Sequence, residues 1–409
     1  MSDVDTDATD EGRAADLGPA GDLGGRPDDG RAADIAVLSP ALRTRVLSLD
    51  EADEARRAWE RIAEARGGLP VMRDWPWTAA WLRHYGDVVR SSFLLVEDAA
   101  GAPHGVALLG RSRRWFGPVP IRTLWIGTAN SPVGQEICAE FAPIPALPGH
   151  EAAVTRTVLD AARGMRGWDE LRIDGVPGTE TRELLAGWPP ERVHTRVEPA
   201  PHFRLADLDA GADVASGLSG GARRRARASL RAMDAHGAVT VEWADERAHA
   251  EDVLAELTEL HQARWTADGR PGLFAPGRFA SVHRELMPEL VDAGRAVLFR
   301  LRVDGRTIGC LYHLIDGDRL AFYQSGFARP EDNRLRPGLV THLHCMDEAR
   351  TRGFAVYDFL AGEARYKRDL SNGAGETWRI GLRRPRLRLR AYDAARRLRE
   401  RLQDGDDDA

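Results

Sequence analysis

A single lysine stands in a chain whose other strong bases are all arginines. The sequence contains 57 Lys and Arg residues, and only Lys367, in the stretch GEARYKRDL, is a lysine. Its ammonium is a compact point charge, and its pKa can fall on burial, whereas the pKa of arginine effectively cannot. Chemistry that needs either property would explain Lys367 as a catalytic residue; chance retention is the alternative.

Two carboxylates lie close to this lysine. Asp358 falls inside the predicted strand AVYDFLAG (355–362), between Tyr357 and Phe359, and Glu363 follows that strand directly. A carboxylate buried in a strand without a partner is costly. Asp358 therefore needs a partner, which either a reactive site or a structural ion pair with one of the arginines would supply.

Three residues of a predicted helix combine types that seldom share a surface. His261, Arg264 and Trp265 have helical spacing and therefore share one face. A solvated face rarely contains Trp, and a core face rarely contains Arg with His. The set predicts the wall of a cleft, in which Trp265 stacks on a substrate and Arg264 binds a carboxylate or phosphate. Capping of the helix end by His and Arg is the alternative.

Polar residues also interrupt a predicted apolar strand, RLAFYQSGF. Tyr323, Gln324 and Ser325 place three polar-tipped side chains there. We interpret Gln324 and Ser325 as substrate-binding residues and Tyr323 as a hydroxyl donor.

Two other clusters favour structural interpretations. His342, His344 and Cys345 resemble metal ligands, but helix positions i and i+2 point to different faces, so no metal site is predicted. The helix GGARRRARASLRAM (220–233) has arginines around it and no interleaved aromatics. It favours a solvated helix, or one that lies along an acidic ligand, and leaves tRNA as a possible partner.

The bulk composition is that of a globular protein of about two domains. Hydrophobic residues make up 43% and charged residues 29% of the 409 residues, and the net charge of −6 does not favour nucleic acid or an anionic membrane. Cys138, Cys310 and Cys345 form no C-x-x-C, so neither a disulfide framework nor a zinc site is expected. No signal-peptide pattern or long apolar run occurs, and we expect a cytoplasmic protein without membrane insertion.

The pattern of elements divides the chain into four parts. Residues 1–34 and 404–409 are acidic tails that we expect to be disordered, because they cannot bury enough apolar surface to offset their ordering entropy. The apolar pattern predicts the same order of elements in residues 35–210 and in residues 211–403. The order is helices, then strands joined by short turns, then a helix and a final strand. The Gly- and Pro-rich segment 128–149 is interpreted as an irregular surface connection.

Several stretches of the second half together resemble the FemAB-like, CelD-like branch of the GNAT acyltransferase superfamily. They are LHQARWTADGRPGLFA (260–275), FYQSGF (322–327), RPGL (336–339) and YDFLAGEARYK (357–367). The resemblance implies an α/β fold of two tandem GNAT-like domains, an N-terminal one at 35–210 and a catalytic one at 211–403. Each would have a mixed, mostly antiparallel sheet flanked by helices.

The resemblance also implies roles for residues. Acyl-CoA would be the co-substrate, with no metal, and its phosphates would lie at the start of the helix after the central strand. The matching residues are Arg334, Arg336, Gly338, Leu339 and Val340, with one glycine fewer than the usual motif and with Pro337 removing an N–H. Tyr366 would protonate the departing thiolate, and Asp358 or Glu363 would accept the amine proton.

The resulting hypothesis is an acyl-CoA-dependent N-acyltransferase, of the acetyltransferase type, that acts on a small-molecule or glycan-linked amine. Two alternatives remain. One is an aminoacyl-tRNA-dependent transferase of the FemAB type. The other is a non-catalytic GNAT-like binding module in polysaccharide biosynthesis.

Overall fold

The computed structural model describes residues 41–116, 119–132, 134–141, 144–329, 335–390 and 392. The predicted tails lie outside these residues. No helix in the described ranges combines the length and the apolar character needed to cross a membrane.

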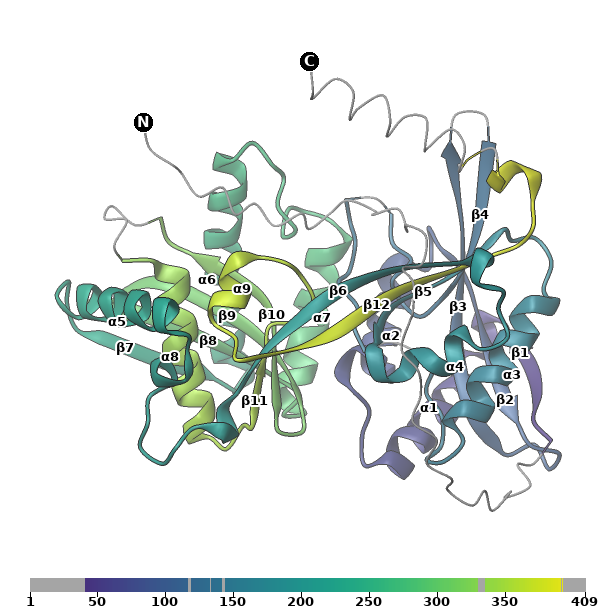
Figure 1. Cartoon of the computed structure of the whole chain (residues 1–409), viewed down its shortest axis with the longest axis horizontal. Coiled ribbons are helices and arrows are strands. Elements are labelled where there is room, and N and C mark those ends of the chain that lie inside the picture. Colours follow the sequence, from purple (N-terminus) through teal and green to yellow (C-terminus); the bar gives the residue numbers. More distant parts are fainter. Residues whose placement is uncertain are drawn as a thin grey trace.

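One twelve-stranded mixed sheet runs through both halves of the chain (Figure 1). Its strands are β1 (Arg43–Leu47), β2 (Arg90–Glu97), β3 (Pro103–Phe116), β4 (Val119–Ile126), β5 (Glu170–Pro177), β6 (Val193–Arg204), β7 (Val239–Ala244), β8 (Ala296–Val303), β9 (Arg306–Asp316), β10 (Arg319–Phe327), β11 (Val356–Asp358) and β12 (Gly373–Arg383).

Helices cover both faces of this sheet. They are α1 (Ala52–Arg66), α2 (Trp75–Tyr85), α3 (Glu151–Gly164), α4 (Thr181–Leu185), α5 (Gly220–Asp234), α6 (Arg247–Ala267), α7 (Arg278–Asp292), α8 (Pro337–Thr351) and α9 (Arg365–Asp369). Short 3-10 turns are η1 (Leu49–Glu51), η2 (Val71–Arg73), η3 (Gly178–Glu180), η4 (Pro190–Arg192), η5 (Leu205–Asp207) and η6 (Val214–Gly217).

The two halves repeat one topology and exchange strands. The spatial order is β1-β2-β3-β4-β5-β12-β6-β11-β10-β9-β8-β7. Each of the strands β1–β6 occupies the place, counted from one end of the sheet, that its counterpart in β7–β12 occupies counted from the other end. In each half the fifth strand runs parallel to the fourth, β5 beside β4 and β11 beside β10. The long strands β6 and β12 pair antiparallel and cross between the lobes in Figure 1, so β12 lies between β5 and β6. The predicted α/β fold of tandem units is confirmed.

Alternating strand residues create the layers of the core. In the first half, Phe93 and Leu108 face α1 and α2, whereas Leu94 and Leu109 face α3. In the second half, α6 and α7 cover one face and α5 and α8 cover the other.

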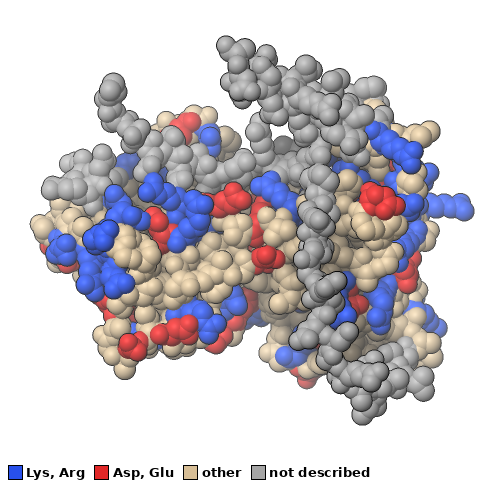
Figure 2. All heavy atoms as spheres, in the orientation of Figure 1, with Lys and Arg blue, Asp and Glu red and all other residues tan. Residues whose placement is uncertain are grey.

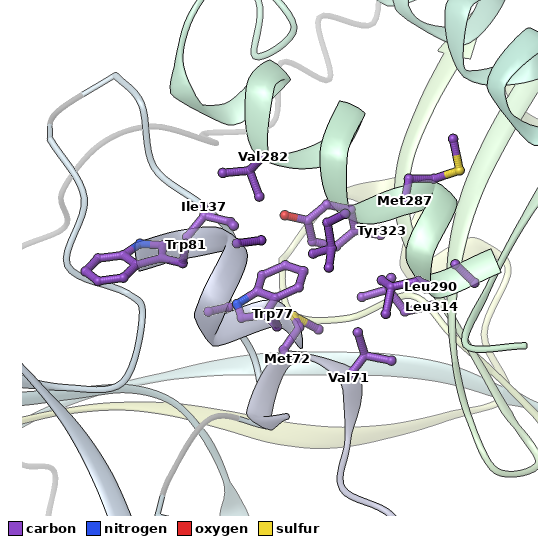
Figure 3. Close-up of a cluster of buried hydrophobic side chains, with 14 of the residues drawn as sticks. Val71, Met72, Trp77, Trp81, Ile137, Val282, Met287, Leu290, Leu314 and Tyr323 are labelled. Atoms are coloured by element: carbon purple, nitrogen blue, oxygen red, sulfur yellow. The ribbon is translucent and has the colours of Figure 1, made fainter. Parts of the chain in front are cut away.

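The α1–α2 layer and the α6–α7 layer merge into one core between the halves (Figure 3). Trp77 of α2 lies there edge-on to Tyr323 of β10, with ring centres 5.8 Å apart. The Tyr323 hydroxyl and His283 Nε2 of α7 are 3.0 Å apart. Apolar contact therefore fixes the halves against each other.

Two local details differ from the sequence-based expectation. The strand predicted at 355–362 is only β11, Val356–Asp358, because Leu360 has a φ of 59° and the chain leaves the sheet. The elements β1 and α9 were not predicted; both are only five residues long.

We predict that Ile380→Ala in β12 destabilises the whole protein by about 2–4 kcal/mol, because this fully buried side chain fills the core of the first half. Urea unfolding followed by circular dichroism and by tryptophan fluorescence should show one shared transition at lower urea. Val241→Ala, on the edge strand β7, is the control, and its effect should stay within about 0.5 kcal/mol. Two transitions, of which the variant shifts only one, would contradict the coupling of the halves.

Candidate functional site

A cavity of about 1230 Å³ opens at the junction of the two halves. Its walls come mainly from β3–β6, β12 and the segment after β4, and the second half contributes Leu273, residues 361–364 and Lys367. The lining contains nine Arg or Lys and six Asp or Glu residues. This formal excess of positive charge contrasts with the net charge of −6 of the whole chain.

The floor of the cavity is a charged face of the sheet. Leu171 and Ile173 of β5 pack in the α3 core, so the alternating Arg172 and Asp174 point to the opposite face. Arg172 and Asp174 pair at 3.1 Å.

The next two strands continue this floor with a bridging carboxylate. Arg379 of β12 and Arg196 of β6 lie directly opposite each other. Like charges in that position repel. Both bind Glu198, at 3.3 and 3.0 Å, which offsets the repulsion.

One wall is the segment after β4, interpreted from the sequence as a surface connection. Trp77 Nε1 donates to Thr128 Oγ1 at 3.0 Å, and the Tyr85 hydroxyl donates to the Gln135 carbonyl at 2.7 Å. These bonds to α2 hold the segment over the sheet, so its interpretation as a surface connection is wrong. Ile137, a large apolar residue in this segment, is buried and was the signal in the sequence that the segment packs against the core.

This segment contributes Glu140, which sequence reasoning missed. The Ala361 N–H donates to Glu140 Oε1 at 2.8 Å, and the Thr377 hydroxyl lies 3.4 Å from Oε2. Burial raises the pKa of Glu140 to about 7, and nearby Asp358 adds to the rise, while the Ala361 N–H and Lys367 oppose it. A carboxyl of this pKa can both accept and return a proton near neutral pH.

Lys367 of α9 also lines the cavity. Its side chain is 5% exposed, and Nζ donates to the Ala361 carbonyl at 2.7 Å. The same short loop thus presents its Ala361 N–H to Glu140 and its Ala361 carbonyl to Lys367. Gly362 has a φ of 134°, and a Cβ at this position would lie 3.1 Å from Nζ, so a side chain there would crowd the ammonium.

Asp358 lies where the parallel strands β10 and β11 separate. The last paired residues are Ala321 and Asp358, after which β10 continues to Phe327. Asp358 is buried, binds Arg319 at 2.5 Å and accepts a 2.8 Å hydrogen bond from the Leu360 N–H. Its partner is therefore a structural arginine, one of the two alternatives from the sequence. Glu363 is exposed and lines the cavity.

The two predicted catalytic tyrosines lie among core side chains. Tyr366 stacks on His342, with ring centres 5.7 Å apart, and packs on the core of the second half. Tyr323 belongs to the core between the halves, bound to His283. Neither residue lines the cavity.

The predicted substrate-binding set is divided between core and surface. His261 is buried, with Nδ1 3.0 Å from the Ser325 carbonyl, and burial lowers its pKa. Gln324 of β10 is also buried. Arg264 is exposed, and Trp265 packs near His261 and Arg270. None of the five predicted residues lines the cavity.

The predicted phosphate-binding residues cluster at the start of α8. Arg334 lies outside the described residues. Arg336 caps the helix with a φ of 39°, and no side chain caps the first turn. Gly338 packs against Phe327 at the end of β10, Leu339 is half-buried, and Val340 is buried with its N–H on the Arg336 carbonyl.

No cluster of three or more potential metal ligands occurs among the residues that the structure describes. His342 Nδ1 and His313 Nε2 each lie 2.8 Å from the Tyr357 hydroxyl, which makes a buried polar chain in the second half.

Comparison with known proteins relates the second half to one family. Residues 220–368 match the family model described as an acetyltransferase (GNAT) domain. No curated protein matches the chain at a significant level.

Solved structures of similar shape include FemX (13% identity, TM-score 0.49, covering 78% of this chain and 95% of that chain). Others are L-PGS from Bacillus licheniformis (11%, 0.49, 83% and 95%) and a tandem GNAT protein from the clavulanic acid biosynthesis pathway (12%, 0.42, 84% and 98%). Identities this low carry no information on substrate.

The raised pKa of Glu140 predicts a dependence of stability on pH. The folded protein binds this proton more tightly than the unfolded chain, so the stabilising effect is present below pH 4.5 and is lost as the pH rises towards about 7. Between pH 5 and pH 8 the free energy of unfolding of the wild type should fall relative to that of Glu140→Gln. The upper bound of this fall is about 3 kcal/mol. The observed fall should be smaller than this bound, because the carboxyl faces an open cavity. Urea denaturation of both proteins at both pH values measures this difference. Parallel pH profiles would show that Glu140 ionises normally.

Proposed function

Residues 220–368 belong to the GNAT acetyltransferase family, which makes the chain an acyltransferase, and from this premise we propose that it transfers an acyl group to an amine in the junction cavity. The observation that supports this site is the placement of Glu140 and Lys367 on the two sides of one loop residue, Ala361. The GNAT assignment expected from the sequence is confirmed; the donor, the acceptor and the residue roles below are proposals.

The two side chains fit the two charges that develop during transfer. The amine nitrogen attacks the acyl carbonyl, whose oxygen becomes an oxyanion, and Lys367 supplies a compact positive charge for it. Glu140 accepts the proton that the amine loses. When the carbon–sulfur bond breaks, Glu140 returns that proton to the thiolate, so no net proton is needed.

Acyl-CoA is the proposed donor. The start of α8 is free of side-chain caps, and the N–H groups of its first turn suit the donor's diphosphate, with Arg336 beside them. The strand β11 leaves β10 after Asp358, immediately before the loop that contacts Glu140 and Lys367. We propose that the acyl end reaches the cavity past this loop.

Lys367→Arg tests the role of the lone lysine. Arginine keeps the charge but replaces the compact ammonium with a planar fork, so thiol release from acetyl-CoA and longer acyl-CoAs with a panel of amines should fall about 100-fold or more. Thermal melting should stay within a few degrees of the wild type. The exposed neighbour Arg368→Lys, in the same helix, is the matched control. Wild-type turnover in Lys367→Arg would remove this residue from the mechanism, and absence of acyl-CoA binding in the wild type would remove the donor.

A second candidate donor is aminoacyl-tRNA, and one feature of α5 favours it. The exposed Arg224, Arg227 and Arg231 share one helix face, which differs from the even distribution expected from the sequence. Positive charge gathers over this end of the molecule in Figure 2. Arg225 of α5 binds Asp369 of α9 at 2.8 Å, so the basic helix contacts the helix that contains Lys367.

A gel-shift assay with total tRNA at low salt distinguishes the donors. If tRNA is the donor, reversing Arg224, Arg227 and Arg231 to Glu should abolish a shift that weakens steeply with added salt. Reversal of the exposed Arg57 and Arg61 of α1 should leave the shift intact. A wild-type protein that does not bind tRNA leaves acyl-CoA as the donor.

A further inference from the structure

The junction cavity contains buried polar atoms that no protein group satisfies. Within the described part of the chain, Arg172 Nε, Asn130 Nδ2 and Ser131 Oγ are buried without a hydrogen-bond partner, and all three residues line the cavity. Asn130 and Arg172 are only 3% and 6% exposed. Buried polar groups are nearly always hydrogen-bonded in folded proteins. Three unmet groups in one cavity indicate that a ligand completes them.

These atoms gather around one tryptophan. The Asn130 amide lies over Gly110 of β3, 2.7 Å from the position that a Cβ would occupy, so only glycine leaves room for it. Gly110 pairs with Trp125 of β4, and the Arg172 guanidinium lies 4.6 Å from the centre of the Trp125 ring. Ser131 is the next residue along the chain from Asn130. Arg172 therefore comes from β5, and Asn130 and Ser131 come from the segment after β4.

Their chemistry indicates an oxyanion. The arginine Nε–H and the asparagine amide are donors, and the serine hydroxyl can donate as well. The ligand must therefore supply acceptor oxygens. The excess of Arg and Lys over Asp and Glu in the lining favours oxygens that are negatively charged.

We propose that Arg172, Asn130 and Ser131 bind a phosphate or carboxylate group of the acceptor while its amine is held at Glu140. This inference rests on the proposed acyl transfer and narrows the acceptor to an amine that also has an anionic group. The segment after β4 contains both Asn130 and Glu140. Binding of the anion would therefore fix the same segment that positions the proton acceptor.

Isothermal titration of the full-length protein with inorganic pyrophosphate and, separately, with citrate tests the site and separates phosphate from carboxylate. We expect at least one of these anions to bind the wild type. Arg172→Lys keeps the charge but removes the Nε–H, and Asn130→Ala removes the amide; each should weaken binding about tenfold. The control is Arg182→Lys, at an exposed arginine of α4. Helix α4 packs with α3 on the other side of the sheet, so this variant should bind the anions with unchanged affinity. Asn130→Ala keeps the test valid if Arg172→Lys does not fold.

Three results would overturn the proposal. The first is that the wild type binds neither anion, and the second is that the wild type and both cavity variants bind with equal affinity. The third is that Arg336→Gln, at the start of α8, loses binding while the two cavity variants keep it. Failure of the proposed chemistry is recognised separately. If Glu140→Gln keeps full turnover while Arg172→Lys loses anion binding, the anion site stands and the role of Glu140 falls.

Discussion

The antiparallel pairing of β6 with β12 is the constraint on which the rest of the structure depends. Each of these strands is the last strand of its own half and completes the sheet of the other half. The ladder extends from Gly373 opposite His202 to Leu382 opposite Val193. Removing β12 would expose the hydrogen-bonding edges of β5 and β6 together. The halves are therefore interdependent, and the cavity at their junction exists because the strands cross there.

The crossing also explains why the cavity is charged. Helices α1 and α2 cover one face of the sheet at β2 and β3 with apolar side chains. At β5, β12 and β6 the same face has charged side chains, which are Arg172, Asp174, Arg196, Glu198 and Arg379. Buried charges are tolerated when they are paired, and Glu198 joins two arginines for this reason. Arg172 is satisfied only in part, since it binds Asp174 but keeps an unmet Nε–H. A polar substrate can enter such a surface without displacing the core.

Much of the fold could be predicted from the sequence because periodic apolar patterns report burial directly. The meander β8–β10, the helix α8 and the repeated order of the two halves all follow from such patterns. Lys367 could be identified as a candidate site residue from composition alone, because it is the single lysine of the chain. Glu140 could not, because its segment has no periodicity and is fixed by hydrogen bonds from Trp77 and Tyr85, which are distant in sequence. Tyr323 and His261 also show the limit, because a strand or helix face does not reveal whether a polar side chain meets a ligand or a core partner.

Backbone strain supports the assignment of function to the junction rather than to either half. Among the described residues other than glycine, positive φ occurs at Phe141 and Leu360, which adjoin Glu140 and Ala361, and at Asp304 and Arg336 elsewhere. A left-handed conformation at a bulky residue costs of order 1–3 kcal/mol and persists only where surrounding contacts hold it. Phe141 follows Glu140 and Leu360 precedes Ala361, so the two strained residues flank the hydrogen bond from the Ala361 N–H to Glu140. This hydrogen bond joins the two halves. Neither half alone would bring Glu140 and Lys367 to the same loop, so the pair proposed to react forms only when the crossed sheet is complete.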